Sequence, residues 1–190
     1  MQSNIRKLTF FMDHKFTEQI RQWLETHEDE RDYAVGALYL LKLSGNQIMY
    51  IEWILEQVGT AEVWQTSFSI SEEFLRRLFF ITKDKKVSRI NLVLDHKTTN
   101  KTLKLWTFIT QVVEHTYLAD NHSKILLVRS DKGDTVSVVT SQNLTRGNRH
   151  ESAFISTDPM IFATLHSQVE DLIRNHSVPL SELFEQRINS

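Results

Sequence analysis

The chain is predicted to be an α/β domain in which helices flank a mixed β-sheet. Three features support this fold class. Strand-like and helix-like runs alternate between residues 60 and 113, two further strand-like runs then meet at a hairpin turn, and a helix closes the chain. Hydrophobic residues make up 41% of the chain and charged residues 24%, a balance that allows a buried core.

The first 58 residues are predicted to be mostly helical. Apolar residues recur at helical spacing at Phe16, Ile20, Trp23 and Leu24. A second apolar run, Tyr33–Leu43, ends at a Ser-Gly-Asn helix stop, and residues 47–58 repeat the helical pattern. We therefore expect a helical N-terminal segment over residues 1–46 and the α/β domain over residues 47–190.

The remaining elements follow from composition and turn signals. The expected strands cover residues 61–68, 88–94, 115–118, 124–129, 136–141 and 152–156, and the expected helices cover 72–82, 100–113, 158–175 and a short stretch from Pro179. Ser71 and Asp158 are expected N-caps because their side-chain oxygens can accept from free backbone N–H groups. The turn at 131–134 reads as the hairpin.

Composition excludes several classes of protein. The 22 basic and 24 acidic residues give a formal charge of -2, so any nucleic-acid contact must come from a local basic patch. The chain has no cysteine, which removes disulfide scaffolds, zinc–thiolate sites and cysteine nucleophiles. No stretch reads as a signal peptide or a membrane span. We expect a cytoplasmic protein with no membrane partner.

A group of polar residues lies where two expected strands meet. His122 and Lys124 are two residues apart at the start of one strand, so their side chains share a face. Ser141 and Asn143 have the same spacing at the end of the next strand, and Glu151 follows. An imidazole can bond covalently to phosphorus, and an ammonium and an amide can stabilise charge on the phosphate oxygens.

These residues resemble the motif of the phospholipase D superfamily. That motif is His-x-Lys, four residues, Asp, then a Gly/Ser-Ser-x-Asn element, and the stretch SQNLTRGNRHE resembles its continuation to an acidic residue. The resemblance implies a phospholipase D-like half-site domain. It also implies that His122 is the nucleophile or the leaving-group acid and that Lys124 and Asn143 hold the phosphate. Ser141 and Glu151 are then expected to orient the imidazole.

The chain departs from the family pattern at two positions and in motif number. Arg129 stands where the family has Asp, Thr140 stands where the family has Gly, and the motif occurs once. Single-motif members of this size are mostly dimeric nucleases and related phosphodiesterases. The resemblance therefore implies a homodimer that acts on nucleic acid, with DNA favoured over RNA.

Several neighbouring residues allow more than one interpretation. Thr140, Arg146 and Arg149 are candidate substrate-binding residues, although the arginines can equally be solvated loop residues. His150 and Glu151 could suggest a metal pair, but the sequence shows no third ligand. Asp95-His96-Lys97 is interpreted as a solvated loop end. We expect no metal and no cofactor.

The function that the sequence supports best is a metal-independent phosphodiesterase, an endonuclease of the hydrolase class, that works through a phosphohistidine. The alternative is a non-catalytic module that binds nucleic acid or protein on a degenerate phospholipase D-like fold. Arg129 and Thr140 favour this alternative mildly. Lipid hydrolysis is a weaker third option.

Overall fold

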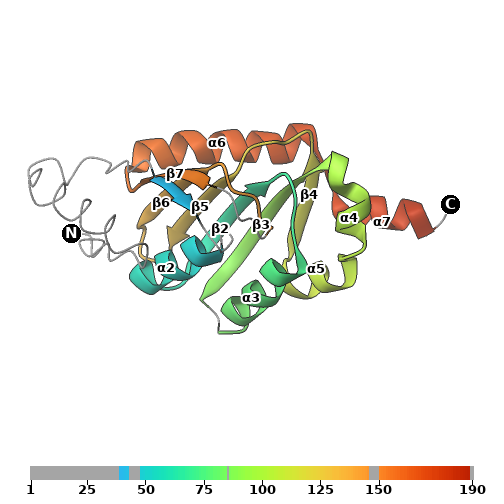
Figure 1. The fold of residues 1–190 in the computed structure, drawn as a ribbon, viewed down its shortest axis with the longest axis horizontal. Helices are drawn as coiled ribbons and strands as arrows, with labels where there is room; N and C mark the ends of the chain where they lie inside the picture. The colour runs from blue at the N-terminus through green and yellow to red at the C-terminus, as the bar shows by residue number, and fades with distance from the viewer. Residues whose placement is uncertain (1–38, 43–47, 85, 146–149, 189–190) are drawn as a thin grey trace, which may run out of the picture.

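The computed structural model describes residues 39–42, 48–84, 86–145 and 150–188, which build an eight-stranded sheet with helices on both faces (Figure 1). The predicted α/β fold class is confirmed. The elements in chain order are β1 (Tyr39–Lys42), α2 (Ile48–Val58), β2 (Ala61–Ser67), α3 (Glu72–Lys83), β3 (Val87–Asp95), the 3₁₀ helix η3 (His96–Thr98), α4 (Thr99–Leu103), α5 (Trp106–Val112), β4 (His115–Ala119), β5 (Ile125–Ser130), β6 (Thr135–Thr140), β7 (His150–Ser156), α6 (Pro159–His176), β8 (Ser177–Pro179) and α7 (Leu180–Ile188).

The strand order of the sheet is β1-β7-β6-β5-β2-β3-β4-β8. Strands β2, β3 and β4 run parallel to one another, and every other neighbouring pair is antiparallel. As a result, the carboxyl ends of β2, β3, β4 and β6 lie at one end of the sheet, together with the amino ends of β5 and β7. The motif residues lie at this same end of the sheet.

The core has one large cluster and one small one. The large cluster packs helices α2, α3 and α5 against one face of the sheet, and the small cluster packs α6 against the other. Figure 1 shows α6 along one side of the sheet and α2, α3 and α5 along the opposite side. Among the described helices, none combines the length and apolar character that crossing a bilayer requires.

Helix α3 shows how sequence pattern becomes packing. Ser71 caps its first turn by accepting from the N–H of Phe74 at 3.3 Å. Four apolar residues at helical spacing are then buried against the sheet: Phe74, Leu75, Leu78 and Ile81. Asp158 caps α6 in the same way, accepting from the N–H of Met160 at 2.7 Å. Both predicted caps are confirmed.

Three element predictions are wrong. Tyr39–Lys42, expected within a helical run, is an edge strand that pairs with β7. The single helix expected over 100–113 is two helices, since the N–H of Leu105 bonds to the carbonyl of Thr102 and breaks the α-helical ladder. The edge strand β8 was not expected. The helices expected within residues 1–38 lie outside the described residues.

Candidate active site at the strand ends

The hairpin brings the two halves of the motif together as predicted. Lys124 immediately precedes β5, and its carbonyl accepts from the N–H of Thr140, the last residue of β6, at 3.0 Å. Beyond β6, an isolated bridge between Ile70 and Leu144 ties the Asn143 segment to the segment after β2. The site is therefore assembled from the ends of three adjacent strands.

His122 and Lys124 form a close pair at this end of the sheet. The His122 side chain is exposed, whereas Lys124 is 8% exposed. The Lys124 ammonium donates to the His122 carbonyl at 2.6 Å and lies 3.4 Å from the His122 Nδ1. The ring of Phe68 meets the imidazole at an angle of 60°, with 5.2 Å between centroids. The imidazole thus has a cation on one side and an apolar contact on another.

Asn143 is held with a defined orientation. Its Oδ1 accepts from the backbone N–H of Phe68 at 3.2 Å and from the Ser67 hydroxyl at 3.3 Å. Because two donors face the oxygen, the amide nitrogen is on the other side of the group. The Asn143 Nδ2 is therefore the atom suited to donate to a phosphate oxygen.

Ser141, Glu151 and Thr140 join β6 to β7. The Ser141 hydroxyl donates to the Glu151 carboxylate and accepts from the Ser152 N–H at 3.0 Å. Thr140 is buried, and its hydroxyl donates to the Ser152 carbonyl at 2.8 Å. Within the described part of the chain, none of these side chains hydrogen-bonds the His122 ring. Their direct contacts stabilise the strand junction beside the site.

Glu151 nevertheless acts on the site through its charge. Burial lowers the pKa of Lys124, while the carboxylates of Glu151 and Asp95 oppose that decrease. Burial, assisted by Glu151, also raises the pKa of Tyr50 on α2 to about 12. The negative charge of Glu151 therefore favours the protonated, positively charged form of Lys124.

Solved structures share this architecture. Nuc from Salmonella typhimurium, a phospholipase D family member, superposes with a TM-score of 0.57 at 14% identity, over 76% of this chain and 97% of Nuc. The chain has the phospholipase D fold.

Two further structures extend the comparison with this fold. NucT from Helicobacter pylori gives a TM-score of 0.57 at 12% identity, over 75% of this chain and 98% of NucT. Polyphosphate kinase from Porphyromonas gingivalis gives 0.51 at 12% identity, over 91% of this chain and 31% of the kinase. The amino-acid sequence matches no family model and no curated protein, so the likeness lies in the structure.

Arg129, a departure from the phospholipase D motif, lies away from the site. It is near the end of β5 opposite His122, where it donates to the Glu62 carboxylate at 2.7 Å and covers the ring of Trp64 at 4.9 Å. The local partners of Arg129 explain why a cation is accommodated at this position.

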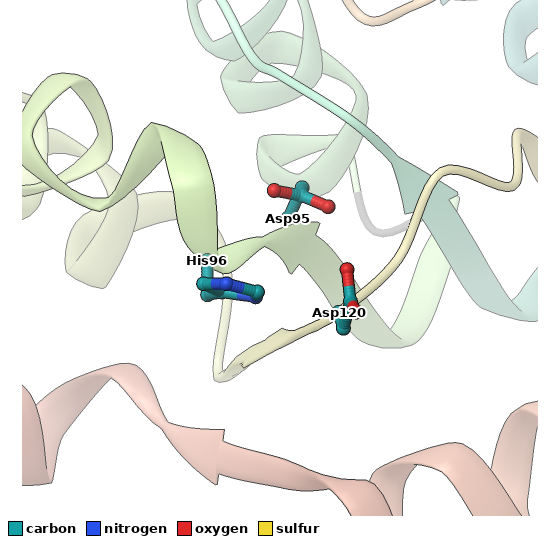
Figure 2. Close-up of side chains that lie close together, drawn as sticks. All are labelled: Asp95, His96 and Asp120. Atoms are coloured by element: carbon teal, nitrogen blue, oxygen red, sulfur yellow. The ribbon is translucent and has the colours of Figure 1, made fainter.

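The corner beside His122 contains a group that sequence reasoning missed. Asp95, His96 and Asp120 lie together at the ends of β3 and β4, each offering a metal-ligating atom within 4.8 Å of the others (Figure 2). The interpretation of residues 95–97 as a solvated loop end is wrong for Asp95, which is 1% exposed.

These three residues are the described ones that could hold a metal, but other partners already occupy them. Asp95 accepts from the backbone N–H groups of Lys97 at 2.7 Å and Asn121 at 3.1 Å. The Lys97 ammonium lies 3.8 Å from an oxygen of Asp120. A metal ion would have to compete with these contacts. Arg146 and Arg149, the predicted phosphate-binding arginines, lie outside the described residues.

Proposed function

We propose that this chain is a metal-independent phosphodiesterase that hydrolyses nucleic acid, with His122 as nucleophile and an active site shared by two copies. The observation that supports the proposal is that Lys124 lies beside His122 and that Phe68 contacts both the His122 ring and the Asn143 amide, at one end of the sheet of a phospholipase D fold. The three groups supply a nucleophile, a cation and an amide donor, which together suit an anionic phosphodiester.

The reaction has two steps. One imidazole nitrogen attacks phosphorus while the bond from phosphorus to the leaving oxygen breaks, and a charged imidazole gives that oxygen a proton. Water then attacks phosphorus and breaks the phosphorus–nitrogen bond, and the second imidazole, now neutral, takes the water's proton. The products are an alcohol and a phosphomonoester, and both imidazoles return to their starting states.

Lys124 has to move during this cycle. A nitrogen that attacks phosphorus carries no proton, so attack through the His122 Nε2 requires the ring proton on Nδ1. An ammonium is only a donor and cannot stay against a protonated Nδ1 at the observed 3.4 Å. We infer that a bound phosphate draws the Lys124 ammonium away from His122, which frees the imidazole for attack.

The two-step reaction needs two imidazoles, and each chain supplies one motif. A second copy related by a two-fold axis would place its own His122 opposite the first, with Lys124 and Asn143 of both chains around the phosphate. We favour DNA over RNA as the substrate. The proposal is supported by the single motif and by the fold shared with Nuc and NucT.

The test is turnover of a generic phosphodiester, bis-p-nitrophenyl phosphate, and of plasmid DNA, with and without excess EDTA. We expect the same rate in both conditions and loss of turnover in His122→Ala. The matched control is His115→Ala, at the opposite end of β4, which should remain active. Loss of activity in EDTA that magnesium restores would contradict metal independence. DNA binding by His122→Ala and wild type alike, with no turnover by either, would instead support the binding-module alternative.

A further inference from the structure

The loop that carries His122 is anchored by the residue before it. Asn121 is 4% exposed and lies between β4 and β5. Its side-chain Nδ2 donates to the carbonyl of Ser67 at 3.3 Å, and its Oδ1 accepts from the N–H of Ser123 at 3.1 Å. A single buried amide therefore connects the end of β2 to the residues on both sides of His122.

Asp95 provides the second anchor of the same loop. Its Oδ2 accepts from the backbone N–H of Asn121, and its Oδ1 accepts from the N–H of Lys97 at the start of the 3₁₀ helix. The carboxylate belongs to the last residue of β3, and Figure 2 shows it beside Asp120 at the start of the loop. A buried carboxylate is costly unless donors satisfy it, and here both oxygens are used to fix backbone.

The residue after His122 completes the anchoring. The Ser123 hydroxyl lies 2.8 Å from the hydroxyl of Thr66 on β2, and the Thr66 hydroxyl also accepts from the N–H of Ile125 at 2.9 Å. Residues 121, 123 and 125 are thus tied to the sheet. The side chains of His122 and Lys124 lie together, with 3.4 Å between the Lys124 Nζ and the His122 Nδ1.

We propose that Asp95 and Asn121 are positioning residues that fix the His122 loop, and that the geometry of the nucleophile depends on them. Neither residue belongs to the motif that suggested the site. A nucleophile must approach phosphorus in a defined direction, and misplacing it by about 1 Å can cost about 100-fold in rate. This inference rests on the proposed function, in which His122 attacks phosphorus.

The alternative is that these residues only stabilise the fold. Ser130 provides a matched control, because it is also 4% exposed and its hydroxyl makes three hydrogen bonds. Those bonds join it to the N–H of Lys132, the N–H of Asp134 and the Asp134 carboxylate. They lie in the hairpin turn at the opposite end of β5. Ser130→Ala should therefore reduce stability without disturbing His122.

The experiment compares Asn121→Ala, the isosteric Asp95→Asn and Ser130→Ala in the full chain. With bis-p-nitrophenyl phosphate as substrate, we expect kcat to fall about 10- to 100-fold in the first two variants while KM stays within about twofold. Ser130→Ala should keep its kcat even where its Tm falls as much. Unchanged kcat in Asp95→Asn, or an equal loss of kcat in Ser130→Ala, would overturn the positioning role.

A second readout separates this inference from the proposed function. The imidazole NMR resonances of His122, assigned by their loss in His122→Ala, report its surroundings without turnover. If wild type shows no turnover, the proposed function fails, and these resonances decide the positioning role. A larger shift in Asp95→Asn and Asn121→Ala than in Ser130→Ala supports it, and unshifted resonances overturn it.

Discussion

At the scale of single residues, the charge of Glu151 is the feature that a pH experiment can test. In the proposed reaction Lys124 has to be protonated to hold the phosphate. Burial lowers the pKa of Lys124, and the Glu151 carboxylate opposes that decrease. Glu151→Gln removes the negative charge that raises the pKa of Lys124, so Lys124 loses its proton at a lower pH. We expect the alkaline limb of phosphodiester binding, followed as KM against pH, to move to lower pH.

The same substitution at Glu170 is the control for that profile. Glu170 lies on α6, where it accepts from the Trp64 indole at 2.8 Å and pairs with Arg174. Glu170→Gln should leave the alkaline limb of the KM profile at the same pH as in wild type. An alkaline limb that stays fixed in Glu151→Gln, or moves to higher pH, would be inconsistent with the charge relation between Glu151 and Lys124.

Asn143 allows the donor and the acceptor of one side chain to be tested separately. Asn143→Asp keeps an oxygen for the Phe68 N–H and the Ser67 hydroxyl but replaces the Nδ2 donor with an anionic oxygen. We expect kcat/KM to fall about 100- to 1,000-fold with the fold retained in a thermal melt. A variant with near wild-type kcat/KM would show that Asn143 does not donate to the substrate.

The contact of Lys124 with the end of β6 could be predicted, because the residue spacing and the hairpin follow directly from the sequence. Phe68, Asp95 and Asn121 could not be predicted, because their roles depend on partners far along the chain. The Asn121 amide, for example, contacts Ser67 on another strand end. No local pattern distinguishes such a residue from an ordinary loop asparagine.

At the scale of elements, the central strands were predictable and the edge strands were not. β2 and β3 are seven and nine residues long and mostly buried, and strands of this length contain enough apolar and β-branched residues to be recognised in the sequence. β1 and β8 are short edge strands with four and three residues, too few to show alternation. At the start of α5, Trp106 stacks on Phe184 of α7 with 4.3 Å between the ring centroids, a contact distant in sequence that no local pattern reveals.

The two ends of strand β5 allow effects on catalysis and effects on stability to be tested by separate substitutions. Its amino end carries the site, and Arg129 near its other end interacts with Glu62 and Trp64. We expect Arg129→Ala to cost about 1 kcal/mol of unfolding free energy in denaturant melts, since the pair is half-exposed. Its kcat should equal that of wild type, whereas Lys124→Ala should be inactive. A catalytic defect in Arg129→Ala as large as that in Lys124→Ala would link this end of β5 to the chemistry.

At the scale of the whole molecule, the strand ends that carry the candidate site lie together at one end of the sheet. In the proposed function, a second copy of the chain completes the active site. If the site is shared, a dimer of wild-type and His122→Ala chains retains one imidazole and lacks either the nucleophile or the acid. We therefore expect activity to fall as the square of the wild-type fraction when the chains are mixed under subunit exchange. A linear decline, or turnover by a chain that remains monomeric in sedimentation, would mean that each chain has a complete site.

The most direct test of the central claim is a rapid quench of the enzyme with labelled phosphodiester, followed by mapping of the labelled peptide. Attack by His122 predicts label on the peptide that contains His122, in an adduct that is stable to base and lost in acid, as a phosphorus–nitrogen bond should be. The His122→Ala variant should carry no label. Label on a serine or tyrosine, or a burst of product without any labelled peptide, would contradict the account.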